Sequence, residues 1–197
     1  RPRIRAHRDA EDAGWVFERV AVFRMSVIHG WLKRKLGDLV ELQCGFAFKS
    51  SDFEADGIPI IRMSDLDEGR LNICNAVRVN VNKLKLLSNY ELHAGDYLVG
   101  MSGSIGNYAI VRDEDTPAYL NQRVGRFRLT LKDAVNYEYI THLVRSKSYK
   151  THVELLAAGA AQVNISPSQI ESFELDLPTL PEQSKIAEIL STVDRAI

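Results

Sequence analysis

The segment GMSGSIG contains a serine arrangement that resembles the nucleophile of a hydrolase. Gly100, Ser102 and Ser104 approach the G-x-S-x-G pattern, in which a sharp turn from a strand into a helix exposes a serine hydroxyl. Ser104 stands where that pattern needs its second glycine, and the residues that follow are patterned as a strand. A turn whose backbone N–H groups hold a phosphate and an ordinary hairpin turn fit the segment equally well. A hydrolase is therefore the weakest hypothesis.

The histidines and cysteines form no recognised catalytic or metal-binding pattern. Cys44 and Cys74 lack the C-x-x-C spacing of zinc and redox sites, so two buried thiols are the simpler interpretation. No histidine belongs to an H-E-x-x-H or H-x-E motif; the histidines are His7, His29, His93, His142 and His152. We therefore expect no metal, no catalytic residue and no cofactor in this chain, which would not be an enzyme.

Side chains of the types that bind DNA recur in the segments expected to be loops. Arg, Lys, Asn and Gln read base edges in the major groove, whereas Ser usually binds phosphates. They follow GFAF, or lie within IIRMSD, NQRVG and AAQVNIS, and are Lys49, Ser50, Arg62, Ser64, Asn121, Gln122, Gln162 and Asn164. Each of them could instead satisfy local backbone groups. The composition of these loops suits a protein that reads DNA.

Charge is unevenly distributed along a chain whose net charge is −1. Residues 77–150 carry eleven Lys and Arg against seven Asp and Glu, whereas residues 171–197 carry two against six. The near-neutral total disfavours a protein that coats nucleic acid indiscriminately, but the middle of the chain could face phosphates. An adaptor that binds other proteins and never touches DNA is therefore an alternative.

Hydrophobic spacing and turn residues predict the elements that must position these side chains. The segment NQRVGRFRLTL, residues 121–131, is expected to be a strand with a basic face, with Arg123, Arg126 and Arg128 opposite Val124, Phe127 and Leu129. The other predicted elements are a helix at 36–42 that ends at Gly45, a strand at 58–63, a turn at 67–69, strands at 97–101 and 108–111 joined by SGSIGN, one or two helices at 136–157 ended by Gly159, a helix after the cap Ser166, and a strand at 173–178.

The last predicted helix begins near Pro181 and carries an apolar seam. Ile186, Leu190, Val193 and Ile197 recur at intervals of 4, 3 and 4 residues, as in a coiled coil, with Ile189 beside them. No helix-ending Gly, Asn or Pro follows, so the sequence does not show what this helix packs against. Residues 1–24 differ in composition from the rest of the chain, and residues 1–30 are interpreted as an N-terminal arm or the remnant of a longer segment. No run of about 20 apolar residues and no signal-peptide pattern occurs, so we expect a cytoplasmic protein without a membrane span.

An ordered series of motifs runs from Trp31 to the end of the chain. The series is GIPIIRMSDL, GDYLVGMSGSIGNYAIV, NQRVG, QVNIS and LPTLPEQSKIAEIL. In this order they resemble the DNA-specificity subunit of type I restriction-modification systems. The resemblance implies an α+β target recognition domain at residues 31–178, with a mixed, mostly antiparallel sheet and flanking helices. Residues 179–197 would begin the long conserved-region helix that serves as a spacer. Because a full subunit of that family carries two such domains, the chain would be either a fragment of a longer subunit or a half subunit that pairs with a second copy.

The resemblance also implies a function and partners. Such a domain reads one half of a bipartite site in double-stranded DNA, and its spacer helix pairs with that of a second recognition domain. Modification subunits would methylate adenine with S-adenosylmethionine, and restriction subunits would use ATP and Mg²⁺. We accordingly expect Arg62, the SGSIGN turn, the basic strand and the AAQVNIS loop to face DNA, which adds Ser102, Ser104, Asn107, Arg123 and Arg126 to the candidates.

Overall fold

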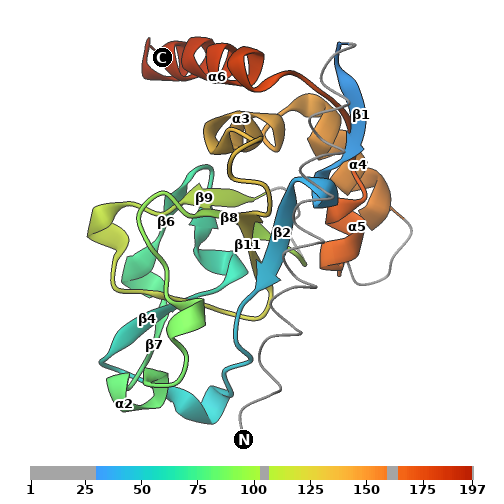
Figure 1. Cartoon of the computed structure of the whole chain (residues 1–197). Helices are drawn as coiled ribbons and strands as arrows, with labels where there is room; N and C mark the ends of the chain where they lie inside the picture. The colour runs from blue at the N-terminus through green and yellow to red at the C-terminus, as the bar shows by residue number, and fades with distance from the viewer. Residues whose placement is uncertain (1–29, 103–106, 159–163, 197) are drawn as a thin grey trace, which may run out of the picture.

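The computed structural model describes residues 30–102, 107–158 and 164–196, which form two four-stranded sheets, two small strand pairs and a group of helices (Figure 1). The first sheet has the antiparallel order β2 (Val40–Cys44), β11 (Val124–Leu129), β8 (Tyr97–Gly100) and β9 (Tyr108–Ile110). The second has the order β10 (Tyr119–Leu120), β4 (Ile58–Ile61), β7 (Val77–Val79) and β3 (Phe53–Glu54), in which β10 and β4 are parallel. The predicted mixed, mostly antiparallel α+β architecture is confirmed.

Short elements complete the strands. β1 (Leu32–Lys35) pairs with β12 (Glu174–Leu177), and β5 (Leu66–Asp67) pairs with β6 (Arg70–Leu71) around the turn predicted at 67–69. Single 3₁₀ turns connect many of the strands: η2 (Leu36–Asp38), η3 (Ser50–Asp52), η4 (Met63–Asp65), η5 (Ile73–Asn75), η6 (Ser88–Tyr90) and η7 (Asp113–Asp115).

The longer helices gather beside the first sheet, and α6 crosses over α3 (Figure 1). They are α3 (Tyr137–Leu143), α4 (Lys147–Ala157), α5 (Pro167–Glu171) and α6 (Leu180–Ala196), whereas α2 (Val81–Leu84) lies at the other end of the molecule. The prediction for α5 is confirmed in detail: Ser166 caps the helix through the N–H of Gln169, and Pro167 occupies its first turn.

The first sheet has apolar cores on both of its faces. Phe127 belongs to the largest core, which the sheet shares with the helices, while Val124 and Leu98 belong to a second core on the opposite face. A third, smaller core forms around Ile60 and Val79 of the second sheet. Because both faces of the sheet are packed against a core, a polar residue in the middle of β11 can reach solvent only beyond the edge of the second core.

The helix predicted at 36–42 is wrong. Leu36–Asp38 forms one 3₁₀ turn, and the chain then enters β2, whose five residues pair with β11. Leu36, Leu39 and Val40 are all buried, so the spacing that indicated one helical face arises from a turn followed by a strand. Pairing with a strand more than 80 residues away in the sequence decided the conformation, which local propensity could not foresee.

Candidate nucleic-acid interface

Backbone pairing joins the loops that hold the predicted DNA-binding residues. Ser102 forms a β-bridge with Asn164, and the N–H of Ile165 donates to the carbonyl of Met101 at 2.8 Å. The N–H of Met101 in turn donates to the carbonyl of Arg123 at 3.1 Å. The segments around residues 102, 123 and 164 therefore lie side by side at the end of the first sheet.

Two more loops join this group through Asn121 and Gln122. The N–H of Asn121 donates to the carbonyl of Ile61 at 3.1 Å, which places the IIRMSD segment against NQRVG. The N–H of Gln122 donates to the carbonyl of Phe46 at 3.0 Å, and Phe46 and Asn121 form a parallel bridge. Loops that are far apart in the sequence thus form one continuous edge, which we call the loop edge: residues 45–46, 61–64, 101–102, 121–123 and 164–165.

The predicted residues differ in how far they reach solvent. Lys49, Ser64, Gln122, Arg123 and Asn164 are exposed, and Arg62 and Asn107 are half-buried. Ser102 and Asn121 are buried, and the hydroxyl of Ser102 lies 3.0 Å from the sulfur of Met63, so these two residues build the loop edge more than they present side chains on it. Ser104 and Gln162 lie outside the described residues.

A short motif, a basic residue followed three positions later by Asp, orients Arg62 and Lys49. The carboxylate of Asp65 accepts from the N–H of Arg62 at 2.8 Å and from the hydroxyl of Ser64 at 3.0 Å. Arg62 Nε lies 3.7 Å from the same carboxylate, which aligns the guanidinium while its side chain stays partly exposed. Asp52 accepts from the N–H of Lys49 in the same way, and that hydrogen bond, with the ammonium of Lys83, lowers the pKa of Asp52. The sequence contains this R/K-x-x-D signal, but the sequence analysis missed it.

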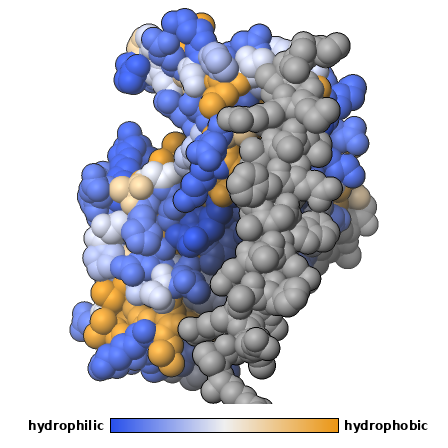
Figure 2. Space-filling view, in the orientation of Figure 1, coloured by the Kyte–Doolittle hydropathy of each residue, from blue (hydrophilic) through white to orange (hydrophobic). Residues whose placement is uncertain are grey.

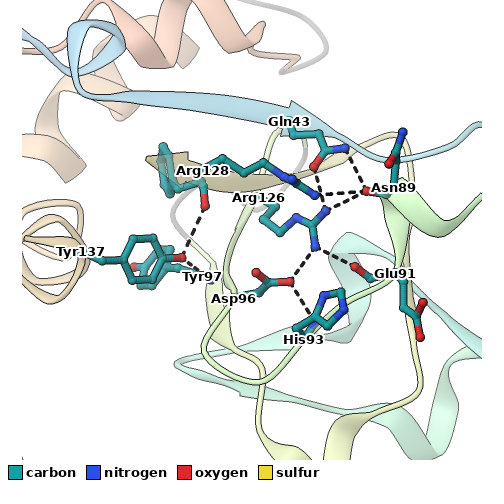
Figure 3. Close-up of polar contacts among 10 residues, drawn as sticks. Gln43, Asn89, Glu91, His93, Asp96, Tyr97, Arg126, Arg128 and Tyr137 are labelled. Carbon is teal, nitrogen blue, oxygen red and sulfur yellow. Dashed lines mark hydrogen bonds and ion pairs between the residues drawn. The ribbon is translucent and has the colours of Figure 1, made fainter. Parts of the chain in front are cut away.

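Arg126 does not lie on an exposed basic face, so this part of the basic-strand prediction is wrong. Its side chain is buried, with 1% of the residue exposed, and points into a ring of acceptors (Figure 3). Nη1 donates to the carbonyl of Glu91 and to the carboxylate of Asp96, each at 2.7 Å. Nη2 donates to the carbonyl of Asn89 and to the side-chain oxygen of Gln43, each at 2.8 Å. Both terminal nitrogens are thus engaged within the protein.

The segment that contains these acceptors explains the burial. Residues 88–96 pass over the middle of β11 and also meet the second sheet, where Glu91 forms an antiparallel bridge with Tyr119 of β10. Next to this bridge, the N–H of Leu92 donates to the carbonyl of Ala118 at 2.9 Å. Arg126 therefore ties this crossing segment to both β2 and β11. Arg128, on the same face of β11, stays exposed and makes one longer contact, 3.3 Å to the carbonyl of Asn89.

Comparison with known proteins decides the family. The model of the type I restriction modification DNA specificity domain matches residues 28–197. The chain belongs to this family. It is 27% identical over 171 residues to the type I restriction enzyme MjaVIII specificity subunit of Methanocaldococcus jannaschii, covering 85% of the chain and 40% of that protein. It is 29% identical over 171 residues to the EcoBI specificity subunit of Escherichia coli, covering 86% and 33%.

Solved structures of type I specificity subunits have the same fold. The S subunit of M. genitalium superposes with a TM-score of 0.60 at 20% identity, over 84% of the chain and 39% of that structure. The HsdS subunit of Thermoanaerobacter tengcongensis gives a TM-score of 0.61 at 15% identity, over 96% and 47%. This specificity domain thus spans less than half of each relative compared, and the family predicted from the motif order is confirmed.

In this specificity domain, α6 has a domain-facing side and an apolar exposed side. Gln183 and Ala187 are buried against the domain, and Ile186 is half-buried against the main core. Ile189, Leu190 and Val193 are 53%, 40% and 49% exposed. The predicted seam is therefore divided between the two sides, and its last member, Ile197, lies outside the described residues.

Polar contacts fix α6 on α3 and the turn that follows it. The hydroxyl of Ser191 donates to the carboxylate of Glu138 at 2.5 Å and lies 2.8 Å from Nε2 of His142. Arg145 Nη1 donates to the carboxylate of Asp194 at 2.6 Å. Burial, together with the charge of Arg145, lowers the pKa of His142, which favours the neutral imidazole in this contact. The direction of α6 relative to the domain is thus specified by hydrogen bonds.

Within the described ranges, no group of three or more His, Cys, Asp or Glu residues could hold a metal ion. The same ranges contain no helix that is long and apolar enough to cross a membrane.

Proposed function

We propose that this chain is a target recognition domain that reads one half of a bipartite DNA site within a type I specificity subunit. The loop edge carries this proposal, because backbone pairing brings the loops of Arg62, Gln122, Arg123 and Asn164 together from separate parts of the sequence. Arg62 is half-buried and the other three residues are exposed. Guanidinium and amide groups side by side can contact phosphates and base edges together.

The chain would act through partners. Its membership of a family of DNA specificity domains supports a recognition role. Modification subunits would methylate adenine with S-adenosylmethionine. Restriction subunits would use ATP and Mg²⁺. The exposed stripe of Ile189, Leu190 and Val193 would pair with the spacer helix of a second recognition domain, because an apolar helix face of this kind is stabilised by a partner helix.

Arg123 provides the first test of the DNA-binding edge. The protein that contains this chain is assembled with its modification subunits, and DNA affinity is measured at several salt concentrations. If Arg123 contacts a phosphate, Arg123→Ala weakens binding to all duplexes alike and reduces the salt slope by about 1. The matched control is Arg128→Ala, because Arg128 is exposed at the opposite end of β11.

Gln122 tests base reading. If Gln122 reads a base edge, Gln122→Ala relaxes specificity at one position, at a cost of about 1–3 kcal/mol. If Arg123→Ala and Gln122→Ala both bind DNA with the affinity and specificity of the control Arg128→Ala, the loop edge is not the DNA-binding surface. No binding of the unmodified complex to any duplex at low salt would favour the protein–protein adaptor instead.

A further inference from the structure

An aromatic residue, Phe46, lies on the loop edge, where its backbone pairs with polar residues. Phe46 is 37% exposed, and Trp31 is the other exposed aromatic residue among those the structure describes. The carbonyl of Phe46 accepts from the N–H of Gln122, and its bridge partner is Asn121. The exposed part of the ring is in contact with water, which is unfavourable for apolar surface. Burying that surface against an apolar group of a ligand would therefore be favourable.

The ring is fixed before any ligand arrives. It leans edge-on against Phe48, with ring centres 5.0 Å apart and planes at 72°, and against Tyr90 at 5.8 Å. The N–H of Phe46 donates to the carbonyl of Leu120 at 2.9 Å. The preceding Gly45 packs so closely that an added Cβ would lie 2.2 Å from that same carbonyl oxygen. A ring held on two sides loses little conformational entropy on binding.

This geometry selects one kind of DNA contact. A wedge that separates stacked bases must project its whole side chain, whereas Phe46 presents about a third of its surface and rests on two other rings. A thymine offers an apolar group in the major groove, its 5-methyl, beside the base edges that amide and guanidinium groups read. We propose that Phe46 contacts the 5-methyl group of a thymine in the recognised half-site, and so contributes to sequence specificity. This inference rests on the proposed function.

The test removes the methyl group without changing base pairing. The recognition site is first mapped from the adenine methylation that the complete system leaves in cells. Each thymine of the half-site is then replaced by deoxyuridine, and binding by the assembled complex is measured. We expect a loss of about fourfold at one thymine, the value of one buried methyl group. Phe46→Ala should lose affinity for the thymine duplex and bind the two duplexes equally.

The control substitution is Leu86→Ala. Leu86 is 95% exposed, follows α2 by two residues and is not part of the loop edge. Figure 2 shows a hydrophobic area at the end of the molecule where Figure 1 places α2. This variant should keep the full difference between thymine and deoxyuridine. A Phe46→Ala variant that also keeps the full difference would overturn the inference, as would an unmodified complex that binds its site specifically but shows no loss at any deoxyuridine.

A second measurement needs no variant. Each thymine is replaced in turn by 5-iodouracil, whose iodine occupies the place of the methyl group, and the irradiated complex is digested and analysed by mass spectrometry. We expect the peptide that contains Phe46 to crosslink to one position of the half-site. This should be the thymine whose replacement by deoxyuridine lowers the affinity. Crosslinks only to other peptides would contradict the inference. Failure of the unmodified complex to bind any duplex specifically would instead contradict the proposed function.

Discussion

Replacing Arg126 by Met should destabilise the domain without removing a DNA contact. Arg126 makes four hydrogen bonds of 2.7–2.8 Å in a buried position, and Met fills much of the same volume without a donor. Asp96 and the carbonyls of Asn89 and Glu91 would lose these bonds. The segment 88–96 would then be held less firmly against the first sheet.

The size of the effect follows from which acceptors can recover a partner. Charged hydrogen bonds contribute about 1.5–3 kcal/mol each, but four such values cannot be added here. The carboxylate of Asp96 is 21% exposed and regains water, and the carbonyl of Asn89 keeps the side chains of Gln43 and Arg128 as donors. Breaking a buried ion pair by removing one partner costs about 3–5 kcal/mol, and we expect a value in that range. Arg126→Lys keeps the charge without the planar fork and should lose about 1–3 kcal/mol.

The assay is chemical unfolding, combined with DNA binding by the assembled complex. The control is Arg128→Met on the same face of β11, which should change the unfolding free energy by about 0.5 kcal/mol or less because Arg128 is exposed. At a temperature where Arg126→Lys is folded, its salt slope for DNA binding should equal that of the unmodified protein. Two results together would refute the reasoning: the unfolding free energies of Arg126→Met and Arg128→Met differ by less than about 1 kcal/mol, and Arg126→Lys has a lowered salt slope. They would show that Arg126 contacts DNA.

Three further predictions concern α6 and the loop edge. The double substitution Leu190→Glu and Val193→Glu should change the unfolding free energy by no more than about 0.5 kcal/mol, but should prevent two copies from pairing through α6, which light scattering measures as molar mass. Ala187→Glu should instead destabilise the domain, because Ala187 is buried. Since the pKa of His142 is lowered on folding, the unfolded chain binds the proton more readily, and the unfolding free energy should fall as the pH drops below about 6.5; pH titration of His142→Asn should show a smaller fall, and an equal fall would exclude His142 as the cause. Gly45→Ala should cost about 1–3 kcal/mol in thermal or chemical unfolding, because its methyl group would overlap the carbonyl of Leu120; an unchanged midpoint would contradict the close packing of the two loops.

Several elements could be predicted because their signals are local. Ser166 and Pro167 specify the start of α5, the SGSIGN segment separates β8 from β9, and the spacing of apolar residues specifies α6. A cap, a turn or a helical face depends on residues within a few positions of one another, so one sequence contains the information. The order of the motifs was likewise sufficient to indicate the family.

The sequence alone determined which side chains of DNA-binding type stand in loops, and tertiary structure decided which of them reach solvent. Arg126 and Arg128 share one face of β11, yet residues 88–96 cover the first and leave the second exposed. Leu36, Leu39 and Val40 have the spacing of one helical face, yet the first belongs to a 3₁₀ turn and the last to β2, which pairs with β11. Phe46 gains its place beside Gln122 from a β-bridge between segments 75 residues apart. Burial and strand pairing depend on what packs against a residue from distant parts of the chain, which local sequence does not specify.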